Sequence, residues 1–225
     1  MIVTIPSGRD IDIRRTKGKD EDILTNTDYA RSGKTLTMFL SSITGLSAEE
    51  LDDMLIGDRM FLFIEIRKLC KGNLYYPRVQ TPFGTSEVQE VDLSVLKHLT
   101  LDRTLVDAGH TFEEIFPVCK KVYKARLLRG KDERTLQKLR LDYPDKFLSY
   151  LMLHRTVEIE GEKTKNIGFF EELDSEDTAF FRDEYQRRDI GYETRIEGYS
   201  KVAGQAFEYE MPLDASFFFS ARKNS

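Results

Sequence analysis

The sequence has few cysteines, no long apolar run and no excess of positive charge. Cys70 and Cys119 are its two cysteines and lie far apart, so we expect reduced thiols in a cytoplasmic setting rather than a disulfide. No apolar stretch reaches the roughly 18 residues of a membrane-spanning helix, and residues 1–6 lack the basic and apolar segments of a signal peptide. The net charge of −5 gives no general attraction for nucleic acid or anionic lipid. These absences disfavour secretion, membrane insertion and nucleic-acid binding.

Patterns typical of enzymes and metal sites are scarce as well. The segment 32–35 ends like a phosphate-binding loop, but Asp28 occupies the position of the first required glycine, so we interpret Gly33 as a helix-ending glycine. No serine or cysteine lies in the context of a hydrolase nucleophile, and the acidic runs are typical of helix N-termini and solvated faces. The histidines, none of them at metal-ligand spacing from cysteines or carboxylate pairs, are His98, His110 and His154. We therefore predict no enzymatic activity, no cofactor and no metal.

The most apolar window of the sequence predicts a buried helix over residues 58–70. Asp58 can act as its N-cap, and Gly72 follows its end. Apolar side chains cover nearly the whole circumference and leave only a narrow stripe through Glu65 and Lys68. A helix that is apolar nearly all round is a buried one. We therefore expect this helix to be the centre of an N-terminal core.

Strands and helices are both predicted on either side of this helix. In the first half we expect a β-hairpin over residues 2–15, helices over 18–32, 35–44 and 47–55, and a strand over 74–79. In the second half we expect a strand over 118–128, helices over 132–141, 146–154 and 175–189, a hairpin over 156–169, and a strand-like tail over 194–219 with turns at Gly198 and Gly204. The fold class is therefore α+β: an N-terminal β-hairpin and helical core followed by C-terminal strands.

The predicted domain boundary lies in the loosest part of the sequence, around residues 101–111. On this division residues 1–100 form an N-terminal α+β domain around the helix 58–70, and residues 101–225 form a C-terminal α+β domain. A single continuous domain is the alternative.

A basic stretch near the middle of the sequence is a candidate contact surface. On the predicted strand, Lys120, Lys124 and Arg126 share one face. One positively charged face of a sheet can dock an acidic partner or a phosphate backbone. The alternative is an ordinary half-solvated strand in a protein of net negative charge.

Three adjacent aromatic residues near the end, Phe217, Phe218 and Phe219, are a second candidate. Side chains of a strand alternate between its faces, so the three rings cannot all enter one core. At least one of them should meet a neighbouring element or another subunit, and exposed aromatic clusters are typical of protein interfaces. We therefore predict that this segment contributes to contacts with other proteins.

Several short motifs occur in an order that resembles a known family. These landmark motifs are residues 5–8, 20–24, 30–33, 55–59 followed by Arg67, 72–76, 191–194, and 212–213 followed by 217–219. Their order is similar to that in the baseplate proteins of T-even-type and related tailed bacteriophages, a family of hub subunits and hub assembly factors. Many similar proteins carry cysteine pairs, resembling zinc-ribbon knuckles, after the motifs at 72–76 and 191–194. The corresponding segments here, 81–84 and 198–204, contain no cysteine, so we expect degenerate ribbon-like hairpins without metal.

The resemblance implies a non-enzymatic virion or assembly protein, made in the host cytoplasm and working at the tail baseplate. Its expected partners are other baseplate or tail proteins, in a symmetric assembly of several copies. The alternative is a transient tail or baseplate assembly chaperone that is absent from the mature virion. A nucleic-acid-binding module that uses the basic stretch is a third class, and the net negative charge counts against it.

Overall fold

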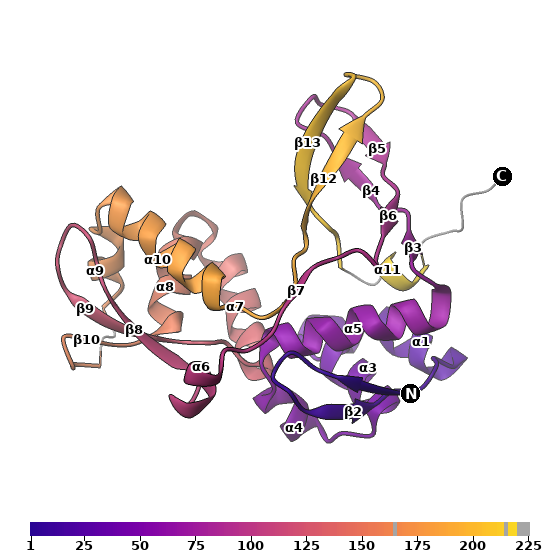
Figure 1. Cartoon of the computed structure of the whole chain (residues 1–225), viewed down its shortest axis with the longest axis horizontal. Coiled ribbons are helices and arrows are strands. Elements are labelled where there is room, and N and C mark those ends of the chain that lie inside the picture. Colours follow the sequence, from indigo (N-terminus) through magenta and orange to yellow (C-terminus); the bar gives the residue numbers. More distant parts are fainter. Residues whose placement is uncertain (164–165, 214–215, 220–225) are drawn as a thin grey trace.

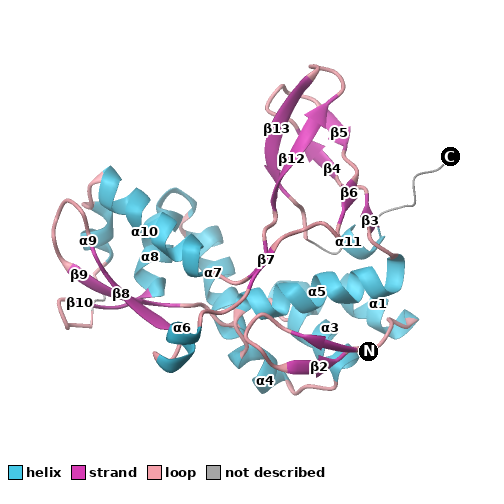
Figure 2. Cartoon of the chain, in the orientation of Figure 1, coloured by secondary structure: helices cyan, strands magenta, loops and turns pink. Residues whose placement is uncertain are grey.

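The computed structural model describes residues 1–163, 166–213 and 216–219. Helices and small antiparallel sheets are both present, so the predicted α+β class is confirmed (Figure 2). Figure 1 shows three parts, which we call the proximal body (residues 1–71 with the last described helix), the arm (two β-hairpins and the short strands at their base) and the distal body (residues 101–190). The arm and the distal body extend in different directions from the proximal body.

Residues 1–71 of the proximal body form a β-hairpin and five helices. In chain order they are β1 (Ile2–Thr4), β2 (Asp10–Asp12), α1 (Gly18–Thr25), α2 (Thr27–Ser32), α3 (Thr35–Thr44), α4 (Ala48–Asp53) and α5 (Ile56–Lys71). The helix predicted over 18–32 is two helices, because Asn26 leaves the helical conformation and its Oδ1 accepts hydrogen bonds from the first turn of α2. Gly33 ends α2 with a left-handed φ of 65°, as predicted.

Helix α5 is the buried central helix that the sequence predicts, with one correction at its start. Leu55 is the N-cap, and Asp58 lies inside the first turn rather than capping it. Glu65 and Lys68 are partly exposed, and the buried residues of the helix are 57–59, 61–64, 66 and 67. The buried series includes two arginines, Arg59 and Arg67, which the apolar pattern did not anticipate.

The arm consists of two hairpins side by side, with a short paired segment at its base (Figure 1). The strands are β3 (Leu74–Tyr75), β4 (Arg78–Gln80), β5 (Ser86–Val88), β6 (Val91–Asp92), β12 (Arg195–Ser200) and β13 (Gln205–Glu210), paired β3–β6, β4–β5 and β12–β13. The Gln89 amide joins the two hairpins, because it accepts from Tyr199 N at 3.0 Å and donates to Tyr199 O at 3.2 Å. The segments 81–84 and 198–204, which lack the cysteine pairs of similar proteins, thus lie in the β4–β5 and β12–β13 hairpins. Gly198 lies within β12 and not at the predicted turn.

The distal body contains a three-stranded antiparallel sheet with helices packed against it. Its elements are α6 (Arg103–Asp107), β8 (Thr111–Ile115), β9 (Val122–Arg126), α7 (Gly130–Asp142), the 3₁₀ turn η1 (Pro144–Lys146), α8 (Phe147–Arg155), β10 (Thr156–Ile159), α9 (Ile167–Glu171) and α10 (Ser175–Arg188). The sheet order is β10–β9–β8. The strand predicted over 118–128 is present as β9 but is shorter, and it pairs with β8 in a hairpin that the sequence did not indicate. The second strand of the hairpin predicted over 156–169 is wrong, because helix α9 begins at Ile167.

Two separate hydrophobic cores divide the chain differently from the predicted division at residue 100. The first core combines residues 5–96 with residues 192–218, and the second combines residues 101–190 with Leu55 and Ile56 of the proximal body. Strands β7 (His98–Leu99) and β11 (Gly191–Tyr192) pair where the chain passes from the arm into the distal body and back to the arm. The C-terminal residues therefore belong with the N-terminal core, and the distal body is inserted between them.

Candidate functional site

The three adjacent phenylalanines lie in the short helix α11 (Ser216–Phe219), not in a strand. Phe217 and Phe218 are 0% and 1% exposed, so the prediction of an exposed aromatic contact surface is wrong for these two residues. Both rings pack against Phe63 of α5, because one helical turn can direct neighbouring side chains toward the same body. Phe219 is 43% exposed, and its contact with another protein stays a prediction.

A buried arginine fixes this helix to the proximal body. The Arg67 guanidinium on α5 donates to Phe217 O at 2.9 Å, to Gly72 O at 2.8 Å and to Leu74 O at 3.0 Å. These carbonyl groups come from the end of α5, from the base of the arm and from α11. A planar guanidinium can bond several acceptors at fixed angles, so Arg67 joins three segments at one point.

The landmark motifs at 5–8, 55–59 and 191–194 meet at the start of α5. Ser7 N donates to Asp58 Oδ1 at 2.9 Å, and burial raises the pKa of Asp58 although the bonds from Ser7 oppose this shift. Gly57 lies directly against the chain that enters β11, because a Cβ atom placed on it would lie 2.0 Å from the Ile190 carbonyl oxygen. A Cβ on Gly191, where φ is +102°, would lie 2.8 Å from the Gly57 oxygen. Only glycine therefore fits at both positions.

The remaining C-terminal landmarks contact α5 and the start of the arm. The Tyr192 hydroxyl donates to the Glu65 carboxylate and accepts from Lys68 Nζ at 3.1 Å. The Tyr75 hydroxyl donates to Pro212 O at 2.9 Å. Landmarks that are far apart in the sequence thus form one framework around α5, and this framework holds the arm on the proximal body.

The basic residues predicted to form one positive strand face do not form it. Lys120 lies in the turn between β8 and β9, with a left-handed φ of 59°, outside either strand. Lys124 is flanked by two carboxylates, with Nζ 3.4 Å from Glu113 Oε1 and 4.0 Å from Glu158 Oε1. Because acidic residues on the neighbouring strands neutralise Lys124, these strands do not form the single positive face that the sequence predicts.

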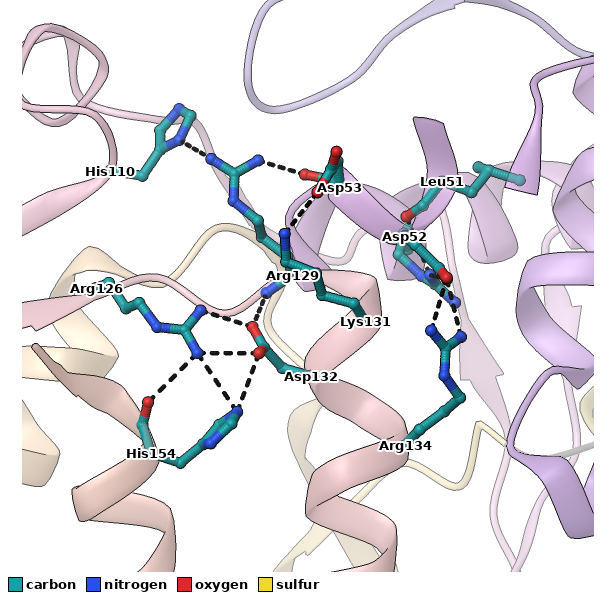
Figure 3. A network of polar contacts seen from close by, with 11 residues as sticks. Leu51, Asp52, Asp53, His110, Arg126, Arg129, Lys131, Asp132, Arg134 and His154 are labelled. Carbon is teal, nitrogen blue, oxygen red and sulfur yellow. Dashed lines mark hydrogen bonds and ion pairs between the residues drawn. The ribbon is translucent and has the colours of Figure 1, made fainter. Parts of the chain in front are cut away.

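Arg126, the third predicted residue, is part of an ionic network inside the distal body. Its guanidinium forms a bidentate pair with Asp132, at 2.8 and 2.9 Å, and His154 Nε2 lies 3.0 Å from Asp132 Oδ1 (Figure 3). Burial alone would raise the pKa of Asp132, but the bonds from His154, Arg126 and the Arg129 amide together lower it. Arg126 is therefore a structural residue that anchors the start of α7.

Charged residues also line the junction between the two bodies, where α4 meets α7 (Figure 3). Arg129 donates through its side chain to Asp53 O and to His110 Nδ1, and the second contact is 3.0 Å long. Lys131 Nζ pairs with Asp53 Oδ1 at 2.7 Å. The bidentate pair between Arg134 and Asp52, at 3.0 and 2.7 Å, continues the series. The sequence pattern favours only a helix N-terminus or a solvated face for Asp52 and Asp53, so these pairs were not predicted.

Arg59 is fully buried at the same junction. Its guanidinium donates to Leu51 O at 3.0 Å, to Thr37 Oγ1 at 3.0 Å and to Glu133 Oε2 at 2.9 Å. A Cβ atom on Gly130 would lie 1.8 Å from the Arg59 guanidinium, so the first residue of α7 must be glycine for the bodies to approach this closely. A buried ion pair that bridges two bodies fixes their relative position more than it adds stability.

Exposed apolar side chains gather at one end of the distal body, partly within 118–128, where the sequence predicts basic contact residues. Ile115, Val118 and Val122, which we call the distal patch, are 55%, 47% and 38% exposed. Ile115 and Val122 are direct partners in the β8–β9 pairing, and Val118 lies in the turn between them. Pro117 is the sequence signal that could have predicted the turn at Val118, because a proline ends a regular strand ladder.

The end of the arm carries a second exposed apolar pair. Tyr199 at the end of β12 and Val202 in the following turn, which we call the arm-end pair, are 56% and 72% exposed. Figure 1 shows this turn at the tip of the arm, away from both bodies. The molecule therefore presents apolar surface at the ends of two parts that extend in different directions.

Within the described ranges no group of three or more His, Cys, Asp or Glu side chains is arranged to hold a metal ion. None of the helices formed by these residues is both long enough and apolar enough to cross a membrane. Searches against protein-family models, curated proteins and solved structures found no match.

Proposed function

We propose that this chain is a non-enzymatic tail baseplate protein of a bacteriophage, placed in the hub region of the baseplate and acting through contacts with other tail proteins. The observation that carries the proposal is the convergence of the landmark motifs on α5. Motifs at 5–8, 55–59, 72–76, 191–194 and 212–213 bond or pack against one another although they lie at opposite ends of the sequence. A set of motifs shared by a family is expected to specify a common framework, and here they do form one.

The exposed surfaces indicate how such a protein would act. The distal patch and the arm-end pair lie on different parts of the molecule, so two neighbours can be bound at the same time. Each patch is small, and small apolar contacts are weak when they act alone. In a symmetric assembly the second contact becomes intramolecular, and the effective concentration makes the combined binding strong.

The first experiment is mass spectrometry of purified, salt-washed particles of the phage that encodes the chain. Copy number is calibrated against the tail tube protein. We expect a small, fixed number of copies per tail. Absence from particles together with presence in infected cells would contradict a structural role and would favour the assembly chaperone.

The proposed role of the distal patch can be tested with polar substitutions at its exposed positions. The double variant Ile115→Thr and Val118→Ser should stay within about 0.5 kcal/mol of wild-type stability, because both side chains are exposed. Its incorporation into tails should fall sharply in a complementation assay. Leu141→Ser is the matched control, since Leu141 is 75% exposed and lies on helix α7, outside the β8–β9 hairpin. Normal incorporation of the double variant would exclude the distal patch as a contact.

A further inference from the structure

A groove of about 790 Å³ lies between the C-terminal end of α10, strands β7 and β11, and the base of the β12–β13 hairpin. It is the inner corner where the arm and the distal body diverge (Figure 1). We call it the acidic corner, because its lining includes Asp183, Asp189, Glu193, Glu208 and Glu210. The only other charged residues in the lining are Arg187 and Arg195, so the net charge is −3. The whole chain of 225 residues has a net charge of −5.

The two arginines are already paired with carboxylates of the chain. Arg195 lies 2.8 Å from Glu208, and Arg187 pairs with Glu184 of its own helix. Asp183 and Glu193 form no ion pair with any residue in the described part of the chain. Both are exposed, so their negative charge is directed to solvent and is free to attract a cation from outside.

One wall of the acidic corner is a sheet face that nothing in the described structure covers. Burial alternates along β12: Arg195, Glu197 and Tyr199 are exposed, whereas the intervening residues turn toward the rest of the arm. Their partners across the hairpin, Glu208 and Glu210 among them, are exposed on the same face. Beyond the groove this face ends at Tyr199, whose ring can pack against the aliphatic part of a long side chain or against a cation.

We propose that the acidic corner and the adjoining β12–β13 face bind a lysine- and arginine-rich, extended segment of a partner protein. Charge complementarity selects the occupant: a basic segment is attracted, whereas the phosphate backbone of a nucleic acid is repelled. The carboxylates come from α10, from the segment after β11 and from β13, so they match charges spread along a chain rather than one compact ion. That the partner is a tail protein rests on the proposed function. That the partner segment is basic rests only on the residues of the surface.

The direct test is the affinity of the full chain for a short fluorescent lysine-rich peptide, with an acidic peptide of equal length as the negative probe. Asp183→Asn, Glu193→Gln and Glu210→Gln together should weaken binding of the basic peptide at least about tenfold at low ionic strength. The binding should also weaken as salt is added, because these charges are exposed. The control triple variant is Asp22→Asn, Asp107→Asn and Asp142→Asn, which removes the same charge from exposed positions elsewhere and should change the affinity less than about twofold.

A second measurement uses the wild-type protein, so its result does not depend on whether the triple variant folds. A carbodiimide joins carboxylates to the lysines of a bound peptide without a spacer, and mass spectrometry then locates the linked residues. We expect links at Asp183, Glu193 and Glu210. Equal loss of affinity in both triple variants, or links spread over Asp22, Asp107 and Asp142, would overturn the proposal.

The two proposals fail in different ways. Selective peptide binding by a chain that is absent from phage particles would refute the baseplate role and leave the acidic corner intact. Presence in particles, combined with a corner variant that binds the basic peptide as well as wild type, would refute the acidic corner and leave the baseplate role intact.

Discussion

The proximal and distal bodies are built in opposite ways. The core of the distal body comes mainly from one uninterrupted stretch, residues 101–190, around a three-stranded sheet. The core of the proximal body combines both ends of the chain around α5, with residues 192–218 packed onto residues 5–96. The distal body can therefore form once its own stretch is present, whereas the proximal body is complete only after the last described helix has docked.

The interiors differ as well. The proximal body buries the charged groups of Arg59 and Arg67. Arg67 bonds carbonyl oxygens of three segments, whereas Arg59 bonds a carbonyl, a hydroxyl and a carboxylate oxygen. Both cores contain packed aromatic rings: Phe116, Tyr123 and Phe181 in the distal core, with ring centroids 4.4 to 6.3 Å apart, and Phe63, Phe217 and Phe218 in the proximal core. Among the described residues, buried arginines occur only in the proximal body. Arginines with several acceptors specify which segments meet, whereas packed rings mainly supply buried area.

The largest expected effect comes from removing one aromatic ring of α11. This change should destabilise the proximal body much more than the distal body. Phe217→Ala should destabilise the proximal body by about 3–5 kcal/mol, because the ring is fully buried against Phe63 and Tyr75. Hydrogen exchange should accelerate for the amides of α5 and much less for those of β9. Phe219→Ala is the control and should change stability by less than about 0.5 kcal/mol, because Phe219 is largely exposed. Equal acceleration in both bodies would show that they fold as one unit.

The next effect concerns the junction between the bodies. Gly130→Ala should cost about 1–3 kcal/mol, because the added methyl group would overlap the Arg59 guanidinium and lie 2.6 Å from Leu51 O. Urea denaturation measures the loss. Gly18→Ala is the matched control at the start of α1, where an added Cβ meets no atom within 4 Å, and it should be neutral or slightly stabilising. A neutral Gly130→Ala would mean that α4 and α7 are not held as closely as described.

The smallest effect is a pH dependence at the same junction. Partial burial, and secondly the charge of Arg129, lower the pKa of His110 below its ordinary value of 6.5. The unfolded chain therefore takes up the proton first, so stability is fully present above pH 6.5 and falls as the pH drops toward the lowered pKa. The loss should be under about 1 kcal/mol, because the ring is partly exposed and screened by solvent.

His110→Asn tests this dependence, since asparagine tolerates the left-handed φ of 66° at this position. The variant should show a flatter stability profile than wild type between pH 7 and pH 5. An unchanged slope would assign the pH dependence to other groups.

Local sequence patterns were sufficient for most helices. The run around residues 58–70 has too few polar positions for an exposed helix, and it became α5. Ser47 and Glu50 specify the start of α4 through a capping box that involves only neighbouring atoms. The errors occurred where two local interpretations competed. Residues 118–128 contain enough β-formers for one strand, and only pairing with β8 shows where the strand begins.

The candidate contact residues were harder to predict, because exposure depends on partners far away in the sequence. The sequence places Phe217 and Phe218 in a predicted contact segment, yet α5 covers them. It places Lys124 on a positive strand face, yet Glu113 and Glu158 on the adjacent strands neutralise this residue. Three separate segments likewise contribute the carboxylates of the acidic corner, so no single window of sequence displays the cluster.

The α+β class, the central buried helix and the glycine that ends α2 follow from local residue types, because each depends on residues within a few turns of chain. Three other features become visible only in the folded molecule: residues 192–218 close the N-terminal core, Arg59 and Arg67 are buried, and particular apolar and acidic side chains face solvent. Burial and charge pairing depend on residues that come together from different segments, and the fold sets which segments meet.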